Sequence, residues 1–558
     1  MNKLKKNRVV LFGCIVLLGL AVYGFKKIEN RNFELAKNLT IFNSIVKELD
    51  LFYVDTIQPN DLVRTGIDAM LYSLDPYTNY FPEEDKSELE QMIRGSYGGI
   101  GSVITYDAKR KRSVIAEPYQ GMPAAEVGLK AGDVLMRIDG EDLEGKDNRE
   151  VSERLRGQVG SSFILEVERP GSDEWLTFDI TRKSIELPTV PYFGVVEKGV
   201  GYINLSSFSG QPARDFKKAF ETLKEKENIT SLIIDLRGNG GGLLDQAIDI
   251  INLFVPRGKT IVKTKGKIAQ ASNVYKTIRE PLDLTIPIAV LVNGGTASSS
   301  EILAGSLQDL DRGVVLGTRT FGKGLVQVPR ALPYGGSLKV TTSKYYIPSG
   351  RCVQAIDYKN KSESGQQSRI PDSLATVFYT EAGRKVLDGG GVIPDVEIES
   401  KKVPNLLFYL LNDNQVFNFA TEYCMKHKSI PSVEQFELSD EDYNRFKEQV
   451  LAADFKYDQQ SEKVLEGLKE IAEFEGYMEG AKEEFEALEK KLTHNLDKDL
   501  DYFASQIKDL ISIEIVKRYY FQRGAIVQQL KSDEVLEKAI GILKDKAAYD
   551  KILSPNEK

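Results

Sequence analysis

Histidine is scarce in this chain. Its 558 residues include only His427 and His494, and both lie in the last third of the sequence. A Ser-His-Asp triad requires a histidine beside its serine, and a multi-histidine metal site requires several. The scarcity of histidine therefore argues against both kinds of site.

Cysteine is also rare, and the three cysteines are Cys14, Cys352 and Cys424. They form no C-x-x-C pair, and Cys14 lies inside an apolar run. This spacing excludes a disulfide framework. It leaves open a single bridge between Cys352 and Cys424.

No charge of one sign dominates the chain. Its 74 lysines and arginines and 82 aspartates and glutamates give a net charge of −8. No domain carries the clustered basic stripe that nucleic-acid binding requires, so we do not expect nucleic acid as a partner. The length exceeds what one hydrophobic core normally spans, so we expect three or four domains.

The amino terminus carries an uncharged run. Val9–Phe25 follows the basic segment Lys3–Arg8, which is the pattern of an export signal. Its length of about 17 residues falls between a signal peptide and a spanning helix, and no clear A-x-A site follows. We therefore expect an uncleaved anchor within residues 1–32, which holds the chain at the periplasmic side of the inner membrane. The alternatives are cleavage, which would release the chain into the periplasm, and a buried core helix.

Four segments follow this terminus. Residues 33–94 have helical apolar spacing and predict a helical region. Residues 95–185 contain clustered glycines and short β-branched runs, which predict a small β-rich module. Between residues 186 and 402, apolar strands alternate with helical stretches, as in an α/β domain with a largely parallel sheet. Residues 403–558 are acidic and helical in pattern. The expected fold class is thus a multi-domain α/β and β protein.

The most informative segment is Val292–Glu301, with the sequence V-N-G-G-T-A-S-S-S-E. It runs from a predicted buried strand through a Gly-Gly turn into a helix. Ser298 falls in the first helical turn, where free N–H groups and the helix dipole favour a developing negative charge. A serine there is placed to act as a nucleophile, with neighbouring amides as an oxyanion hole. Taken alone, however, the segment favours simple helix capping.

A serine nucleophile needs a base, and with histidine scarce the candidates are Lys, Asp and Glu. Lys323 lies between Gly322 and Gly324 in an otherwise uncharged, apolar stretch. Burial favours the neutral amine, which can accept the serine proton. Gln327 could orient that amine if the chain is helical or bent there. Taken alone, the stretch favours a glycine-rich turn with a solvated lysine.

A second glycine-rich turn, Asp235–Gly242, follows another predicted strand. Its amides can bind an anion or an oxyanion, but the turn lacks the G-x-G-x-x-G spacing and the Lys-Ser/Thr pair of nucleotide-binding loops. We expect both glycine-rich turns at strand ends of one α/β sheet, where such sheets place their sites.

In the β-rich module, Gly98–Gly101 leads into a predicted strand over residues 102–105. Turn amides beside an open strand edge suit the capture of a peptide C-terminal carboxylate together with strand addition. An ordinary β module without a ligand is the alternative.

In chain order, these motifs resemble those of the C-terminal processing peptidases, also called tail-specific proteases, which are serine peptidases with an inserted PDZ domain. The resemblance covers about residues 40 to 400, whereas the tail after Pro404 matches no family motif that we identify. The matching segments are Leu74–Thr78, Gly98–Gly101, Pro123–Ala125, Gly128–Asp133, Gly201–Ile203, Asp235–Asn239, Ala297–Glu301, Phe321–Gly324 and Pro348–Arg351.

The resemblance implies a Ser/Lys peptidase core over residues 186–402 and a PDZ domain over residues 95–185. Carried over by position, the nucleophile is Ser298, the general base is Lys323 and the supporting glutamine is Gln327. Thr296 and Ser299 stand where many members have serine and alanine, which keeps these side chains short.

The resemblance also implies two sets of backbone donors. The oxyanion amides fall near Gly241 and Ser299. The amides that bind a peptide carboxylate fall on Gly99, Ile100 and Gly101.

The expected function is that of an exported serine endopeptidase, which binds exposed apolar C-terminal tails of proteins through its PDZ domain and cleaves upstream through an acyl-enzyme. No metal or organic cofactor is implied. A catalytically silent PDZ scaffold in the cell envelope is the alternative, and an acyl-CoA enzyme is a third that explains neither the export signal nor the peptide module. The helical tail is open to three roles: dimerisation, covering the site or recruiting an adaptor.

Overall fold

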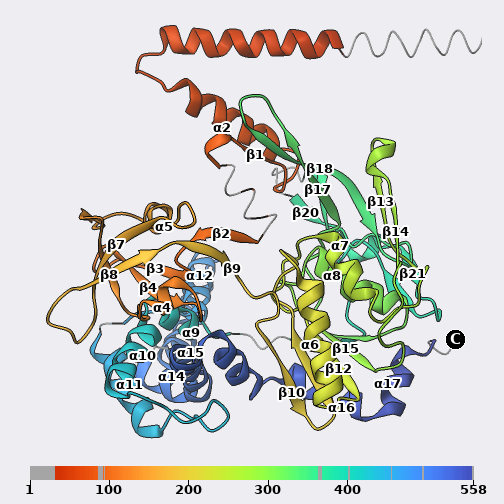
Figure 1. The fold of residues 1–558 in the computed structure, drawn as a ribbon. Coiled ribbons are helices and arrows are strands. Elements are labelled where there is room, and N and C mark those ends of the chain that lie inside the picture. Colours follow the sequence, from red (N-terminus) through yellow and green to blue (C-terminus); the bar gives the residue numbers. More distant parts are fainter. Residues whose placement is uncertain are drawn as a thin grey trace, which may run out of the picture. The chain divides into compact units, whose positions relative to one another are not determined.

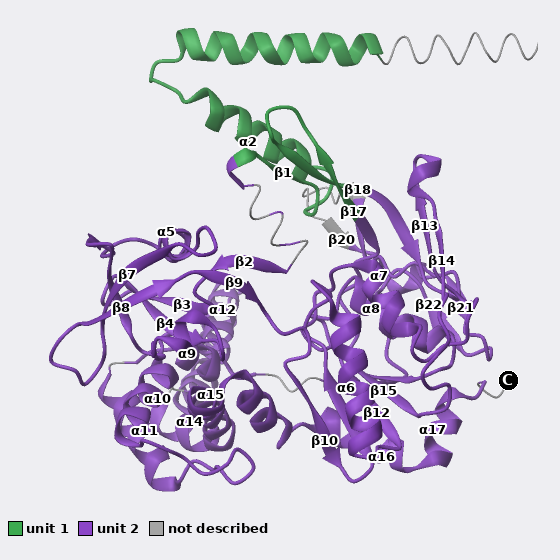
Figure 2. Ribbon diagram, in the orientation of Figure 1, with its two compact units in different colours: residues 1–83, 327–341 green, residues 84–326, 342–558 purple. Residues whose placement is uncertain are grey.

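The computed structural model describes residues 32–85, 89, 92, 95–361, 367–399, 403–453, 455–492 and 495–555. The predicted anchor over Val9–Phe25 and Cys14 lie outside these residues. The chain forms two compact units, one of residues 1–83 with 327–341 and one of residues 84–326 with 342–558 (Figure 2). Within the described part, no helix has the length and apolar content to cross a membrane.

The first unit combines helices with a small piece of sheet. A helix covers residues 32–52, and α2 (Pro59–Tyr72) begins with proline at its first position, where the missing N–H costs nothing. Asp75 then ends the helical part by accepting the N–H groups of Tyr77 and Thr78. The strand β1 (Asn79–Phe81) follows and pairs antiparallel with β18 (Ser337–Tyr346). The predicted helical region therefore contains helices, together with the strand β1 and the 3-10 helix η1 (Glu83–Asp85).

The β-rich module is an antiparallel sheet with two short helices. Its sheet order is β3-β4-β5-β7-β8, so β3 is an edge strand, and β6 pairs with β5. Its elements are β2 (Ser96–Gly99), β3 (Ser102–Asp107), β4 (Arg112–Pro118), α4 (Pro123–Glu126), β5 (Val134–Ile138), β6 (Glu141–Asp142), α5 (Asn148–Leu155), β7 (Ser162–Glu168), β8 (Leu176–Thr181) and β9 (Lys183–Glu186). The pairing of β2 with β9 brings together the points where the chain enters and leaves the module.

The central domain is built on a six-stranded sheet in the order β10-β11-β12-β15-β16-β23. All neighbours are parallel except the β10/β11 pair, so the sheet is largely parallel, as the sequence predicts. The elements that concern this sheet are β10 (Tyr192–Glu197), β11 (Val200–Asn204), α6 (Pro212–Lys226), β12 (Ser231–Asp235), α7 (Leu244–Ile251), β15 (Ile288–Val292), α8 (Ser299–Asp309), β16 (Val314–Gly317) and β23 (Val396–Glu397).

Both faces of this sheet are buried. Alternate residues of β12 point to opposite faces, so that Ile234 packs with α6, α7 and α8 while Ile233 packs on the other side. The remaining elements of the domain are β13 (Thr260–Gly266), η2 (Ala269–Ala271), β14 (Val274–Lys276), β17 (Leu325–Ala331), β19 (Ile356–Lys361), β20 (Gln367–Arg369), η3 (Asp372–Leu374), β21 (Val377–Tyr379) and β22 (Lys385–Leu387).

The chain after residue 403 is helical, as the sequence predicts. Ser439 caps α11 by accepting the N–H of Asp442. The helices are α9 (Asn405–Asn412), α10 (Gln415–Lys426), α11 (Asp440–Ala452), α12 (Gln460–Phe474), α13 (Lys482–Leu492), α14 (Leu496–Tyr502), α15 (Ala504–Leu530), α16 (Glu534–Lys544) and α17 (Lys546–Leu553).

The last two helices do not belong to the core of this helical segment. Leu536 and Leu543 of α16 and Tyr549 of α17 pack against Ile233 and Leu291 of the central sheet, and Figure 1 shows α16 and α17 beside the core strands. The hydroxyl of Tyr549 also accepts the N–H of Ile288 at 3.0 Å. The carboxyl terminus therefore supplies one covering layer of the α/β core.

The rest of the helical segment supports the β-rich module. Phe417 of α10 packs on a small cluster that contains Val114 and Val134, on strands β4 and β5. Arg518 of α15 donates to the carbonyl oxygen of Ala131 at 3.2 Å and to Oγ1 of Thr421 at 2.8 Å. The module and the helices thus share an apolar contact and a hydrogen bond.

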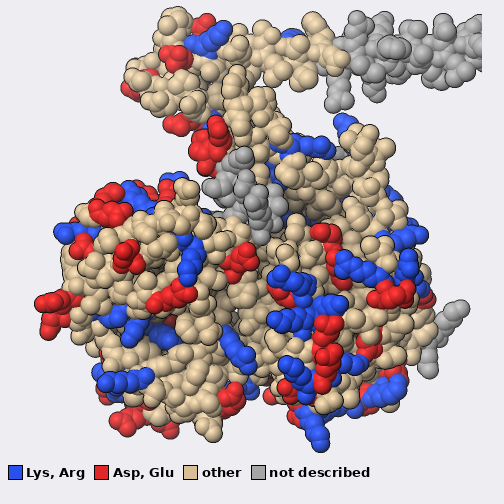
Figure 3. Space-filling model, in the orientation of Figure 1, with Lys and Arg blue, Asp and Glu red and all other residues tan. Residues whose placement is uncertain are grey.

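On the face in Figure 3, lysine and arginine side chains are mixed with aspartate and glutamate side chains among uncharged residues. Both cysteines in the described part, Cys352 and Cys424, are free thiols. The bridge between them that the sequence left open does not form.

Candidate active site

Ser298 occupies a strained backbone position at the end of the turn that leads from a buried strand into a helix. It follows β15 and immediately precedes α8, and its backbone has φ 57° and ψ −118°. A positive φ is unfavourable for a residue with a side chain and persists only where the surroundings hold it. The side chain is half-buried at the positive end of an 11-residue helix. The expected strand, turn and helix are therefore present, but the helix begins at Ser299, so that Ser298 caps it and does not lie in its first turn.

Glu301 holds Ser298 and Lys323 through their backbone N–H groups. Its Oε2 accepts the N–H of Ser298 at 2.9 Å and that of Lys323 at 2.8 Å. Its Oε1 accepts the N–H of Gly322 at 2.8 Å and the hydroxyl of Thr320 at 2.6 Å. The side chain is completely buried, and burial raises its pKa above the ordinary value although these four hydrogen bonds oppose the rise.

Tyr345 holds the same two residues through their carbonyl groups. Its hydroxyl lies 3.0 Å from the carbonyl oxygen of Ser298 and 2.7 Å from that of Lys323. The ring is buried, and burial raises the pKa of the phenol well above its usual value. The hydroxyl is therefore a neutral donor at any physiological pH. Two buried side chains thus fix the backbone of both residues.

Three hydroxyl side chains around Ser298 bind the glycine-rich turn Asp235–Gly242. The hydroxyl of Thr296 donates to Leu236 O at 2.9 Å, that of Ser299 to Gly242 O at 2.8 Å and that of Ser300 to Asn239 O at 2.9 Å. Thr296 and Ser299, the two departures from the family pattern, therefore fasten the turn to the start of α8.

Gly241 lies directly against Ser298. A Cβ atom at Gly241 would stand 2.8 Å from the Cβ of Ser298 and 2.9 Å from the nitrogen of Ser299, and the residue has φ +95°. Only glycine fits such a place. The structure thus brings together the two predicted oxyanion-hole residues, Gly241 and Ser299, and the predicted nucleophile, Ser298.

The two predicted oxyanion amides differ in their hydrogen bonds. The N–H of Gly241 donates to Oδ1 of Asn239 at 2.9 Å. The N–H of Ser299 has no acceptor within the part of the chain that the structure describes. Ser299 is therefore the readier donor, and the role of Gly241 stays a prediction that requires Asn239 to release this amide.

Lys323 lies in the turn between β16 and β17, and its side chain is half-buried. A Cβ atom at Gly322, the preceding residue, would stand 2.2 Å from the Cβ of Ala355, which explains the glycine. Gln327 belongs to the first unit and lies in the strand β17, not in a helix. Its side-chain amide donates to Oγ1 of Thr341 at 3.1 Å. Its support of Lys323 stays a prediction.

The predicted peptide-binding residues lie where β2 leads into β3. Gly99 ends β2, whereas Ile100 and Gly101 form the connection. Gly101 has φ +70°, and Ile100 is buried in the core of the module. Among the described residues, no acceptor binds the N–H groups of Ile100 and Gly101. These two amides therefore stand beside the free edge of β3.

Sequence reasoning missed the residues that hold the site together. Glu301 could have been found, because a serine followed three residues later by glutamate is a known signal at a helix start. Tyr345 gives no local signal, since its contacts depend on how β18 packs beneath the two turns. The same is true of Asp533, which reaches the turn after β12 from the far end of the chain.

Models of three families match the chain. Peptidase family S41 matches residues 199–361, the PDZ domain matches residues 114–169, and "Probable PDZ-protease, C-terminal helical domain" matches residues 406–543. The third match covers the helical segment for which the sequence offered no family motif.

Two curated relatives agree with these families, and the match to a solved structure is given beside them. The chain is 34% identical over 357 residues to the carboxy-terminal-processing protease of Bartonella bacilliformis, and the aligned residues make up 63% of this chain and 81% of that protein. It is 32% identical over 355 residues to a probable CtpA-like serine protease of Staphylococcus aureus, and the aligned residues make up 63% of this chain and 69% of that protein. The photosystem II D1 C-terminal processing protease matches with 27% identity and a TM-score of 0.36 over 65% of this chain and 94% of that one. This chain therefore belongs to the carboxy-terminal-processing proteases of peptidase family S41, and it is a serine peptidase with a PDZ domain.

Proposed function

We propose that the chain is an endopeptidase that cleaves proteins with exposed apolar C-terminal tails by a Ser298/Lys323 acyl-enzyme mechanism. The observation that carries this proposal is that Glu301 Oε2 accepts the backbone N–H groups of both residues. Their main chains must therefore be neighbours, although the two residues come from different turns. A serine and a lysine held in this way form a nucleophile and base pair without histidine.

In the first half of the reaction, Oγ of Ser298 attacks the carbonyl carbon of the scissile bond and gives its proton to Nζ of Lys323. The N–H of Ser299 stabilises the resulting oxyanion at the positive end of α8. The C–N bond then breaks, and the Lys323 ammonium protonates the leaving amine, which departs as the new amino terminus.

In the second half, water attacks the acyl carbon and gives a proton to Lys323, which is neutral again. Collapse of the second tetrahedral intermediate breaks the ester bond, and Lys323 returns the proton to Oγ of Ser298. In each half-reaction Lys323 thus accepts one proton and donates it again, first to the leaving amine and then to Ser298.

The PDZ domain selects the substrate in this proposal. The free amides of Ile100 and Gly101, with that of Gly99, bind the terminal carboxylate, and the tail adds as a strand to the edge of β3. Export is the further part of the proposal: the segment Val9–Phe25 anchors the enzyme at the periplasmic side of the inner membrane. Amino-terminal sequencing of the protein purified from membranes tests this anchor, because a cleaved signal would leave a chain that begins after residue 25.

The experiment that tests the activity uses the chain from Lys26 onward, with an unfolded reporter protein that ends in either an apolar or a di-acidic tail. Mass spectrometry identifies the products. We expect wild type to cleave the apolar-tailed reporter and S298A and K323A to leave it intact while still binding the tail peptide. Binding without any cleavage by wild type would favour the silent scaffold, and cleavage by S298A would mean that another nucleophile acts.

A further inference from the structure

The turn after β12 is held by an ion-pair network that reaches the other end of the chain. The guanidinium of Arg237 donates to Asp235 through Nε at 3.0 Å and through Nη2 at 2.6 Å. The same Nη2 donates to Oδ2 of Asp533 at 2.6 Å. Tyr202 adds its hydroxyl to Oδ2 of Asp235 at 2.7 Å. Arg237 is therefore clamped between two carboxylates, one local and one from the C-terminal helices.

The electrostatics keep Arg237 charged beside Asp235 and Asp533. Burial lowers the pKa of the Arg237 guanidinium, but the hydrogen bonds and charges of Asp235 and Asp533 outweigh it and hold the pKa above its ordinary value. The side chains are largely buried, with exposed fractions of 23% for Arg237 and 12% for Asp533. A charge-assisted hydrogen bond in such surroundings is among the stronger ones in proteins.

Asp533 is itself rigidly placed. Its Oδ1 caps α16 by accepting the N–H groups of Val535 and Leu536 at 3.0 Å, and α16 is packed on the central sheet through Leu536 and Leu543. One carboxylate oxygen therefore belongs to the helix and the other to the turn. The carboxylate therefore links α16 to Arg237, so that the position of the helix determines where the Arg237 guanidinium is held.

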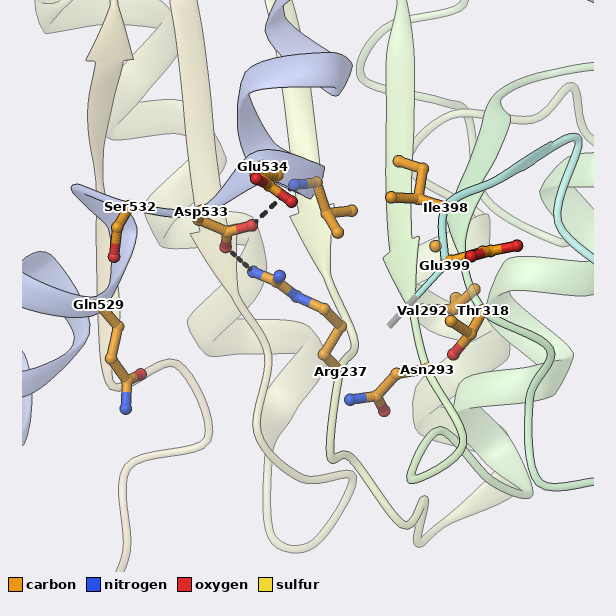
Figure 4. A pocket seen from close by; sticks show the side chains of 12 residues that line it. Arg237, Val292, Asn293, Thr318, Ile398, Glu399, Gln529, Ser532, Asp533 and Glu534 are labelled. Carbon is orange, nitrogen blue, oxygen red and sulfur yellow. Dashed lines mark hydrogen bonds and ion pairs between the residues drawn. The ribbon is translucent and has the colours of Figure 1, made fainter. Parts of the chain in front are cut away.

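A pocket lies beside Arg237, so the hydrogen bond to Asp533 determines where the guanidinium lies on that side. Arg237 and Asp533 line a pocket of about 350 Å³, with Asn293 and Thr318 on its wall (Figure 4). Without Asp533, the guanidinium would face this pocket on that side instead of a fixed partner. Arg237 opens the turn that leads through Asn239 to Gly241, and Gly241 touches Ser298.

We infer that Asp533 is a positioning residue for the peptidase reaction, which acts through Arg237 to fix the turn Asp235–Gly242 against Ser298. The C-terminal helices thus contribute to the active site although they supply no reacting group. This inference rests on the proposed function, because it assigns Asp533 to the oxyanion side of the Ser298 reaction.

The test compares D533N with two other variants in the chain from Lys26 onward. Asparagine caps a helix as well as aspartate does, so D533N keeps α16 capped but turns an amide against the Arg237 guanidinium. D533E keeps the carboxylate. D545N is the matched control, because Asp545 caps α17 through the N–H of Ala548 and is exposed to solvent.

The measurements are kcat and KM for the apolar-tailed reporter, and the inhibition constant of a peptide boronic acid, which mimics the tetrahedral intermediate. We expect D533N to lower kcat and boronate affinity by about tenfold each, with KM within about twofold. D533E should recover most of both losses, and D545N should match wild type.

Unchanged kcat in D533N would overturn the inference. So would equal losses in D533N and D545N, or an unchanged ratio of boronate to substrate affinity, since these outcomes mean that the residue only stabilises the fold. A rise in kcat would overturn it as well, because the charge of Asp533 would then oppose the oxyanion. Failure of the proposed function is distinguishable, since wild type would be inactive or S298A would cleave.

Discussion

Ser298 and Lys323 donate their backbone N–H groups to the same carboxylate oxygen, Oε2 of Glu301, at 2.9 and 2.8 Å. The first residue precedes α8 and the second lies in the turn before β17. One atom therefore accepts hydrogen bonds from both main chains and holds them close together. The arrangement makes Glu301 and Tyr345 sensitive points of the site, although neither is expected to react.

Glu301→Gln should lower kcat without unfolding the core. The glutamine amide would turn an N–H₂ toward N–H donors that now share a carboxylate, and a buried donor without an acceptor costs about 1–3 kcal/mol. We therefore expect kcat to fall by about 10- to 100-fold in a steady-state assay of the reporter protein. Glu221→Gln, on the surface of α6, is the control and should behave as wild type. Unchanged kcat in a well-folded E301Q would show that the shared oxygen does not matter for the reaction.

Tyr345→Phe removes one hydroxyl and little volume. The carbonyl oxygen of Lys323 loses its 2.7 Å donor, whereas that of Ser298 still accepts the N–H of Ile302. We expect Lys323 to be displaced and kcat to fall about tenfold, since such a loss costs on the order of 1 kcal/mol or more. Tyr346→Phe changes the neighbour, whose ring lies under the Lys265 ammonium, and should leave kcat unaltered. Equal kcat values for the two variants would contradict this role.

Leu536→Ala should destabilise the peptidase core, because α16 covers one face of the central sheet. Leu536 is 4% exposed, and leucine-to-alanine changes at buried sites cost about 2–5 kcal/mol. Leu488→Ala on α13 removes the same atoms from a side chain that is 43% exposed and should cost far less. Thermal unfolding of the two variants gives the comparison. Equal shifts of Tm would mean that α16 does not complete the core.

Glu117→Gln tests the contact between the β-rich module and α15 through its pH dependence. Burial raises the pKa of Glu117, Lys517 opposes the rise, and Glu514 adds to it. The folded state therefore binds this proton more tightly than the unfolded state, so the contribution of Glu117 to stability falls as pH rises from about 4.5 through the raised pKa.

The Tm of the glutamine variant should accordingly equal that of wild type near pH 4 and exceed it at pH 7. Glu126→Gln, which changes an exposed residue of the same module that pairs with Lys183 at 2.6 Å, provides the reference for the removal of a surface charge. A difference that is constant across this pH range would mean that Glu117 does not titrate in the contact.

Some parts of the fold follow from local patterns. Uniform apolar runs are typical of strands buried on both faces, and β12 and β15 lie where the sequence predicts them, directly before the two glycine-rich turns. The turn between β5 and β6 has positive φ at both Asp139 and Gly140, as the Asp-Gly pair requires. These features depend on neighbours a few residues apart, so the sequence is sufficient to predict them.

The sequence by itself determined which residues could react: the serine at a helix start and the lysine between two glycines, in a chain with almost no histidine. Only the tertiary structure decided what holds them. Glu301 meets the turn at Lys323, Tyr345 lies beneath both turns, and Asp533 reaches Arg237 across 296 positions. The physical reason is that such contacts depend on which strand ends and helix ends the packed core brings together, and neither periodicity nor composition encodes that choice.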